Sequence, residues 1–175
     1  KEAGLIWIHK VQTVKHALAA ERDGADAVCI MGLEGAGLKS PLILTTLVSV
    51  SMVVKQVKIP VIAAGGIGDA RTFLGALALG AEAVQLGTAF CTVKECPLAD
   101  HYKQALVGAD PYDPKWRDAI LATSKAEDIQ NLRDAVESKA VMQAAAKAES
   151  TGIPKEAGTG AISLAIGFID KIVTA

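Results

Sequence analysis

Four short apolar runs alternate with helix-forming segments in the first half of the chain, and this alternation constrains the fold more than any other feature. The runs are apolar throughout, whereas a strand with one solvated face would alternate apolar and polar residues. Runs of this kind are typical of parallel strands covered by helices. The predicted strands are "LIWIHK" (Leu5–Lys10), "ADAVCIM" (Ala25–Met31), "VIAA" (Val61–Ala64) and "AEAVQL" (Ala81–Leu86).

Helix start and stop signals fall between these runs. Side chains that can cap a helix precede the apolar segments, and Gly24 and Gly80 suit the turns that end two of them. Ser40-Pro41 is a good cap and first helical position. The predicted helices are Val14–Arg22 after Thr13, a helix that begins at Ser40-Pro41 and carries Leu44, Leu47, Val48 and Val54, and Ala70–Leu79 after Asp69.

A repeated sequence pattern favours a parallel barrel over a doubly wound sheet. "GADAVCIMG" (Gly24–Gly32) and "GAEAVQLG" (Gly80–Gly87) are near copies, each of which ends a helix, forms a strand and closes on glycine. Quasi-repetition of this kind suits a parallel (βα)8 TIM-type barrel better than a doubly wound sheet. The first strand is also not followed by the G-x-G-x-x-G of a dinucleotide-binding sheet. Only four strands can be found, so we expect half a barrel.

The composition excludes several classes of partner. A formal net charge of −1 provides no basic excess for nucleic acid or an anionic membrane, and 4% aromatic residues provide few rings on which bases could stack. Three cysteines without close spacing argue against a disulfide framework or a metal site and favour a reducing, cytoplasmic location. No apolar run has membrane-spanning length and no signal peptide is visible. The chain starts with "KEAG" and enters a strand at once, so we expect part of a longer polypeptide.

Three regions are expected along the chain. Residues 1–110 would hold the barrel half, and the Ala-rich, charged residues 111–149 a helical appendage over the barrel mouth or at a subunit contact. Residues 150–175 read as the linker "STGIPKEAGTG" followed by a closing amphipathic helix, "AISLAIGFIDKI", whose apolar face would pack on the barrel.

Glycine-rich loops follow the third and fourth predicted strands. They are "AAGGIGD", which contains Gly65 and Gly66, and "GTAF", which contains Gly87 and Thr88. In parallel barrels the ligand lies at these strand ends, where glycine amides and helix N-termini can receive an oxyanion. Glycines that only form tight turns are the simpler alternative for either loop alone. Because both successive strand ends carry them, the pattern predicts a phosphate site.

Three segments together resemble a known flavoenzyme family. They are "GADAVCIMGLEGAG", "PVIAAGGIGDARTFLGALALGAEAVQLGTAF" and "KECP". Between Gly4 and about Ala109 the chain is similar to the C-terminal half of the barrel of the FMN-dependent nitronate monooxygenase (2-nitropropane dioxygenase) family, which includes flavin-type enoyl-acyl-carrier-protein reductases. The resemblance implies the C-terminal four βα units plus a helical extension. It also implies oxidation of alkyl nitronates with O₂ to a carbonyl compound and nitrite, with enoyl-thioester reduction as the alternative.

The resemblance also implies which residues bind FMN. The FMN phosphate would be held by Gly65, Gly66 and Ile67 together with Gly87 and Thr88. The loop Glu34, Gly35, Ala36 and Gly37 would close over the cofactor, and Gln85 would face the barrel interior near it. Lys10 could offset the negative charge of a reduced flavin, or be solvated. Glu34 could bind substrate or the ribityl chain, or accept loop amides.

The chain departs from the family pattern at two places. The family usually reads Glu-Ala-Gly-Gly-His where Glu34–Leu38 stand here, so a ring nitrogen is replaced by an apolar side chain. The histidine regarded as the catalytic base would lie before Lys1, and no catalytic residue can be assigned in this chain. His9 could reach the site, or be a hydrogen-bonded structural residue. We therefore expect the isolated chain to be inactive.

A function from another class stays open at this point. The chain could be a non-catalytic module that binds a phosphate ligand or mediates oligomerisation. The expected partners are a small-molecule substrate and, through an unpaired sheet edge, further copies of the chain. Nucleic acid, membrane and metal are not expected.

Overall fold

The computed structural model describes residues 3–37, 39–122, 127, 130 and 163–174. These residues form two compact units, which are described separately. The first comprises Lys1–Gly35 and Leu42–Leu86, and the second comprises Ala36–Pro41 and Gly87–Ala175.

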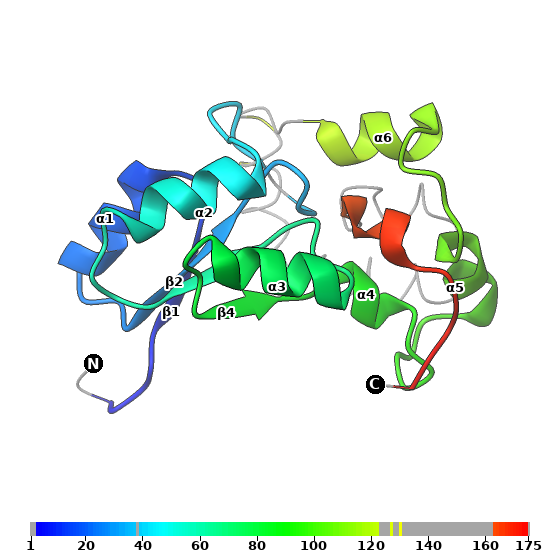
Figure 1. Ribbon diagram of the computed structural model, residues 1–175, viewed down its shortest axis with the longest axis horizontal. Coiled ribbons are helices and arrows are strands. Elements are labelled where there is room, and N and C mark those ends of the chain that lie inside the picture. Colours follow the sequence, from blue (N-terminus) through cyan, green and yellow to red (C-terminus); the bar gives the residue numbers. More distant parts are fainter. Residues whose placement is uncertain (1–2, 38, 123–126, 128–129, 131–162, 175) are drawn as a thin grey trace. The chain divides into compact units, whose positions relative to one another are not determined.

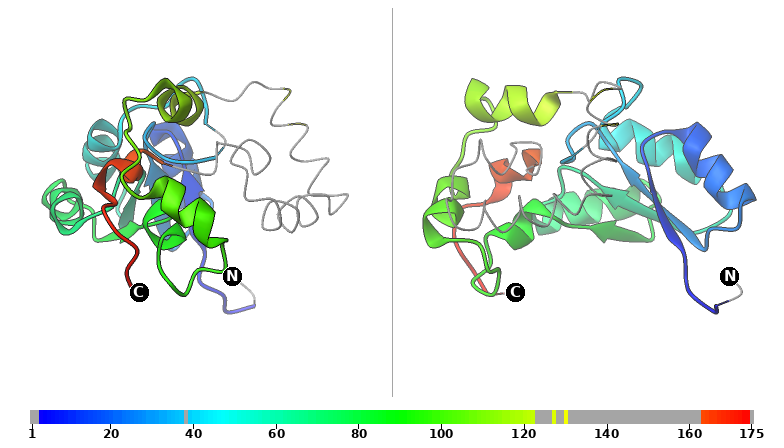
Figure 2. Two further views of the ribbon diagram at one scale, coloured as in Figure 1. Left: turned by 90° about the vertical axis from the view of Figure 1, so that its right-hand side faces the viewer. Right: turned by 180° about the vertical axis from the view of Figure 1, so that it is seen from behind.

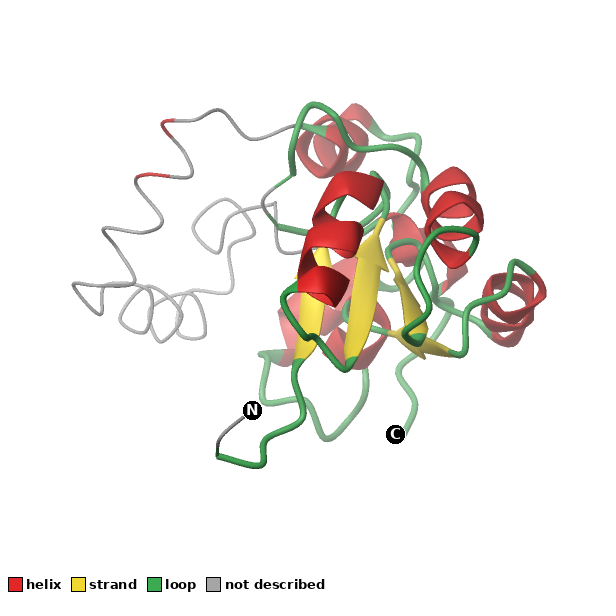
Figure 3. Ribbon diagram, turned by 90° about the vertical axis from the view of Figure 1, so that its left-hand side faces the viewer, coloured by secondary structure: helices red, strands yellow, loops and turns green. Residues whose placement is uncertain are grey.

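The first unit contains one parallel sheet (Figure 3). Its four strands are paired in the order β1-β2-β3-β4, and every pairing is parallel, as the sequence predicts. Each strand therefore follows its neighbour through a crossover that contains a helix. The strands are β1 (Ile8–Val11), β2 (Ala27–Met31), β3 (Val61–Ala64) and β4 (Ala83–Gln85).

The predicted start of the first strand is wrong by three residues. Pairing with β2 begins only where Ile8 lies opposite Ala27, so nothing holds the preceding residues in a ladder. Leu5 and Ile6 are 73% and 79% exposed. Before the strand, the Trp7 amide donates to the Asp26 carboxylate at 2.8 Å.

Three helices cover one face of this sheet (Figure 1). Two of them begin and end where the sequence predicts, to within one residue. The Thr13 hydroxyl accepts the His16 amide at the start of the first, and Asp69 caps the third. Gly24 and Gly80 follow these helices with φ of 94° and 98°, in the left-handed region that glycine favours. The helices are α1 (Val14–Arg22), α2 (Thr46–Val54) and α3 (Ala70–Ala78).

The predicted start of the second helix at Ser40-Pro41 is wrong. α2 begins at Thr46, and the Thr45 hydroxyl accepts the Val48 amide as its cap. The chain before it is held in the loop because the Leu33 amide donates to the Leu44 carbonyl at 2.8 Å. A capping side chain is effective only where the neighbouring contacts allow the helix to begin.

The two faces of the sheet have different surroundings. Side chains of alternate residues point to opposite faces. Val28, Ile30, Val61 and Ala63 lie on the face that packs against the helices and are 3% exposed or less. The other face carries a smaller cluster of Cys29, Met31 and Ala64 with Ile62 packed against it. In a closed parallel barrel this second face is the barrel interior.

The second unit is helical (Figure 2). Its core contains Tyr102, Leu106, Trp116, Ile120 and Ile166. The predicted closing helix is wrong in its described part, residues 163–172: the 3-10 segment η2 (Leu164–Phe168) forms there, and Val173 then makes a parallel bridge to Val93. The chain is extended there because the Ile169 and Val173 carbonyls accept the Gly108 and Lys94 amides. The α-helices are α4 (Thr88–Cys91), α5 (Asp100–Leu106) and α6 (Pro114–Leu121).

Part of the predicted plan lies outside the described residues. α6 falls within the predicted appendage, but most of 123–149 and the linker at 150–160 are among the residues that the structure does not describe. No described helix is long and apolar enough to cross a lipid bilayer.

Candidate functional site

The loop after β3 presents two free backbone donors. Gly65 and Gly66 have φ of 96° and 73°, values that side-chain-bearing residues rarely adopt. The Gly65 amide faces β4, where Ala64 pairs with Gln85, whereas the amides of Gly66 and Ile67 find no hydrogen-bond acceptor within the described part of the chain. A run of unpaired amides at a strand end is suited to an oxyanion.

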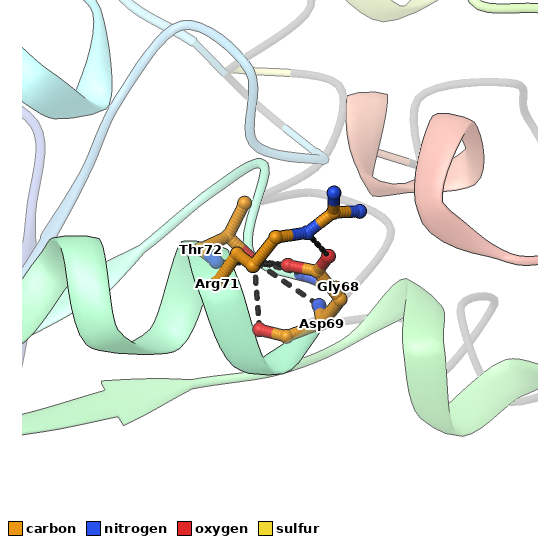
Figure 4. A network of polar contacts seen from close by, with 4 residues as sticks. All are labelled: Gly68, Asp69, Arg71 and Thr72. Atoms are coloured by element: carbon orange, nitrogen blue, oxygen red, sulfur yellow. Dashed lines mark hydrogen bonds and ion pairs between the residues drawn. The ribbon is translucent and has the colours of Figure 1, made fainter.

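The next residues of this loop are fully engaged in starting α3 (Figure 4). The Gly68 and Asp69 amides donate to the Thr72 hydroxyl at 3.1 and 3.0 Å, and Asp69 Oδ1 accepts the Thr72 amide at 2.8 Å. Bonds from Thr72, followed by the bond from Arg71, lower the pKa of Asp69 from 3.8 to about 2. The prediction that Asp69 caps its own helix is confirmed, and its charge is compensated there.

Glu34 accepts hydrogen bonds from the start of α2. Its Oε2 receives the Thr46 amide at 2.8 Å and lies 3.0 Å from the Thr46 hydroxyl. The carboxylate thus provides the negative charge that the first turn of α2 lacks. Of the two roles left open for Glu34, the structure shows contact with a backbone amide, that of Thr46.

Thr46 connects the loops that follow β2 and β3. Besides Glu34, its Oγ1 lies 2.9 Å from the Gly65 carbonyl oxygen and 3.2 Å from that of Ala64. Added Cβ atoms would lie only 2.9 Å from the Gly35 nitrogen if placed on Gly65, and 3.0 Å from the Glu34 Cβ if placed on Gly66. The structure therefore brings together Glu34, Gly35, Gly65 and Gly66. Sequence analysis missed Thr46, although a Thr-Thr pair before an apolar helix is a capping signal.

Lys10 and His9 lie on opposite faces of β1. Lys10 pairs in register with Cys29, whose thiol donates to Gln85 Oε1 at 3.2 Å, so these three residues share the face opposite the helices. His9 points to the helix side, where its ring lies edge-on to Trp7 with centroids 5.4 Å apart. Burial raises the pKa of the Cys29 thiol, and the nearby charge of Lys10 lowers it in part. Lys10 is therefore the better placed of the two for a ligand on this face.

In the second unit, Thr88 is the first residue of α4 and is 3% exposed. The Ser163 amide and hydroxyl both lie within hydrogen-bond distance of Thr88 Oγ1, at 2.8 and 2.9 Å. Gly87, with φ −121°, precedes α4, and an added Cβ would meet no described atom within 4 Å. Sequence analysis missed Ser163, and no local pattern could have indicated it.

The remaining predicted site residues are only partly placed. Ala36 and Gly37 belong to the second unit, and Leu38 lies outside the described residues. The closure of this loop over a cofactor stays a prediction. Among the described residues, no group of three histidine, cysteine or carboxylate side chains could hold a metal ion.

These residues fit a phosphate monoester better than a cation. The free groups of each glycine-rich loop are donors: the amides of Gly66 and Ile67 in one, and the Thr88 hydroxyl in the other. Of the two carboxylates beside the first loop, Asp69 is held by Thr72 and Arg71, and Glu34 is held by Thr46. Donor-only surroundings stabilise an anion and repel a metal ion.

Comparisons with known proteins find relatives for most of the chain. The family model described as nitronate monooxygenase matches residues 1–153. A nitronate monooxygenase of Paraburkholderia phytofirmans is 36% identical over 115 residues, which cover 62% of this chain and 31% of the relative. A relative from Rhodococcus jostii is 43% identical over 103 residues, 59% of this chain and 29% of its own; its name is (3aS,4S,5R,7aS)-5-hydroxy-7a-methyl-1-oxo-octahydro-1H-indene-4-carboxyl-CoA dehydrogenase.

The solved structure of an M276A mutant of FabK from Thermotoga maritima aligns with 99% of this chain and 55% of its own, with a TM-score of 0.75 and 33% identity. FabK is a TIM-barrel enzyme, so the four βα units form part of a barrel of that type. The chain spans about a third of the length of the curated relatives it matches.

Proposed function

We propose, because the chain belongs to the nitronate monooxygenase family of oxidoreductases, that the full-length protein is an FMN-dependent enzyme. It would oxidise alkyl nitronates with O₂ to a carbonyl compound and nitrite. The observation that supports the cofactor assignment is the pair of unpaired amides at Gly66 and Ile67. Bound FMN would supply the electron acceptor for substrate oxidation.

Each candidate residue has a role that its surroundings support. In the first unit, the loop Gly65–Ile67 would bind the phosphate through the amides of Gly66 and Ile67. Gly87 and Thr88 belong to the second unit, and their contact with the phosphate stays a prediction. Lys10, on the same sheet face as Gln85, would offset negative charge on the reduced cofactor. The loop Glu34–Gly37 would border the ligand, with Glu34 anchored to α2.

The proton acceptor is expected outside this chain. His9 lies on the helix side of the sheet, and His16 and His101 lie in α1 and α5. Of the two histidines in the first unit, neither His9 nor His16 shares the face that carries Lys10 and Gln85. The family resemblance implies that the catalytic histidine belongs to a segment before Lys1.

One observation favours a second candidate function. The 43% identical Rhodococcus relative is named for a CoA-thioester substrate. The full-length protein could therefore act on a thioester, as an FMN-dependent enoyl-thioester reductase. A non-catalytic phosphate-binding or oligomerisation module is the third possibility.

The absorbance spectrum of the purified full-length protein tests all three. Bound FMN should give the flavin bands, and anaerobic addition of a short alkyl nitronate should bleach them. Admitting O₂ should then restore the bands and release nitrite. Bleaching by a reduced nicotinamide, with reoxidation by an enoyl thioester and none by nitronate, would favour the second function. Absence of flavin binding would leave only the module.

A further inference from the structure

The Thr46 hydroxyl has one proton and three acceptors around it. The Gly65 carbonyl oxygen is the nearest at 2.9 Å, followed by Glu34 Oε2 at 3.0 Å and the Ala64 carbonyl oxygen at 3.2 Å. Glu34 Oε2 already receives the Thr46 amide at 2.8 Å. Because Glu34 Oε2 already accepts the Thr46 amide, we assign the hydroxyl proton to the nearest acceptor, the Gly65 carbonyl oxygen.

The direction of the Gly65 carbonyl sets the direction of a neighbouring amide. The Gly65 C=O and the Gly66 N–H belong to one planar trans peptide, in which they point in opposite directions. A hydrogen bond that holds this carbonyl against Thr46 thus turns the Gly66 N–H away from α2. The Gly66 amide finds no acceptor within the described residues.

A hydrogen bond is needed to fix the orientation of this peptide because the peptide joins two glycines. Glycine has no Cβ, so the peptide between Gly65 and Gly66 can rotate at low cost. Such a rotation would present a carbonyl oxygen where the loop now presents a donor. A carbonyl in that position would repel an anion.

We propose that Thr46 is a positioning residue for the anion-binding loop: its hydroxyl fixes the Gly65–Gly66 peptide so that the Gly66 amide points toward the phosphate. This inference rests on the proposed function, which assigns the FMN phosphate to that loop. Thr46 itself would touch neither phosphate nor flavin. Gly32 also serves this arrangement, because a Cβ on Gly32 would overlap with the backbone nitrogen and hydroxyl of Thr46.

The test is the affinity of the full-length protein for FMN and for riboflavin, which lacks the phosphate, measured by quenching of flavin fluorescence. The variant Thr46→Val removes the hydroxyl and keeps the shape, whereas Thr46→Ser keeps the hydroxyl. Thr46→Val should weaken FMN binding roughly three- to tenfold, the effect of losing one well-placed hydrogen bond, and leave riboflavin binding unchanged. Thr46→Ser should keep the wild-type ratio of the two affinities.

Thr45→Val is the matched control. The Thr45 hydroxyl caps α2 by accepting the Val48 amide and makes no hydrogen bond to the Gly65 loop. It should lower the melting temperature without changing the ratio of FMN to riboflavin affinity. If Thr46→Val does not fold, Thr46→Ala provides the same comparison.

Two results would overturn the inference and are distinguishable. If the wild type prefers FMN but Thr46→Val keeps the same preference, or loses both ligands equally, Thr46 does not position the phosphate donor. If the wild type itself binds FMN and riboflavin equally, the phosphate assignment fails first, and the role of Thr46 fails with it.

Discussion

Ser163 binds the hydroxyl oxygen of Thr88 with both its amide, at 2.8 Å, and its hydroxyl, at 2.9 Å. A threonine hydroxyl has two acceptor positions and one proton. With both acceptor positions occupied, Thr88 is left as a donor, and no described residue accepts its proton. The contact joins residues that lie 75 positions apart in the sequence.

The first prediction concerns this contact. Ser163→Ala should free an acceptor position on Thr88, so the hydroxyl loses its fixed orientation. FMN binding to the full-length protein should weaken by a factor of roughly two to ten, equivalent to about 0.5–1.5 kcal/mol, and riboflavin binding should not change. Isothermal titration of both ligands measures this. Ser163→Thr keeps the hydroxyl that also caps η2 and serves as the control; a loss of FMN affinity in both variants would contradict the account.

The second prediction compares two glycines. An L side chain at Gly66 would have to adopt φ 73°, which costs about 1–2 kcal/mol, and its Cβ would lie 3.0 Å from the Glu34 Cβ. At Gly87, φ is −121° and no described atom lies within 4 Å of the Cβ position. Gly66→Ala should therefore lower the free energy of unfolding by about 1–2 kcal/mol or more, and Gly87→Ala by much less. Urea denaturation of both variants checks this, and equal losses would refute it.

The backbone strain at Gly66 affects how the phosphate site should be tested. A bulky side chain at Gly66 would strain the backbone as well as obstruct a ligand, so lost FMN binding there would have two causes. Gly87 has no such strain. Substitutions at Gly87 are therefore the better test of its part in ligand binding.

The third prediction concerns the charge of Lys10. Lys10 shares its sheet face with Cys29 and Gln85, whereas His9 lies on the other face. In the FMN-loaded full-length protein, Lys10→Met should lower the flavin reduction potential by on the order of 20–40 mV, because a nearby positive charge no longer stabilises the reduced anion. His9→Gln should leave the potential unchanged. Spectroelectrochemical titration measures both; the reverse order of effects would place the flavin elsewhere.

The fourth prediction is a pH dependence of stability. The pKa of Asp69 is lowered from 3.8 to about 2 in the folded chain, because Thr72 and then Arg71 bind the carboxylate. Its contribution to stability is therefore complete above about pH 4 and is lost as the pH falls toward 2. Asp69→Asn should lower the melting temperature at about pH 6 more than at about pH 2. A difference between variant and wild type that does not change with pH would contradict this.

The parts of the fold that the sequence predicts are those decided by local interactions. Thr13 and Asp69 stand directly before α1 and α3 and bond to amides three residues on, so the caps are readable from sequence. Ser40-Pro41 has the same local signal, but a backbone bond from Leu33 to Leu44 keeps that segment in a loop. The 3-10 segment near Ile166 likewise replaces a predicted helix because distant amides bind the extended chain after it.

The candidate site also has parts that the sequence shows and parts that only the tertiary fold shows. Glycines at strand ends are visible in the sequence, whereas the register that puts Lys10 and Gln85 on one face of the sheet is seen only in the structure. Thr46 and Ser163 could not be predicted as parts of a site, because their partners Gly65 and Thr88 are brought to them only by the tertiary fold.

The most direct test of the phosphate assignment is the amide NMR spectrum of the isotopically labelled full-length protein, recorded with FMN and with riboflavin. Amides that donate to a phosphate shift when the phosphate is present and not otherwise. The account predicts large shifts for Gly66 and Ile67 with FMN, and much smaller shifts for these residues with riboflavin. If FMN binds while these amides stay at their ligand-free positions, the phosphate lies elsewhere and the glycines serve only as turns.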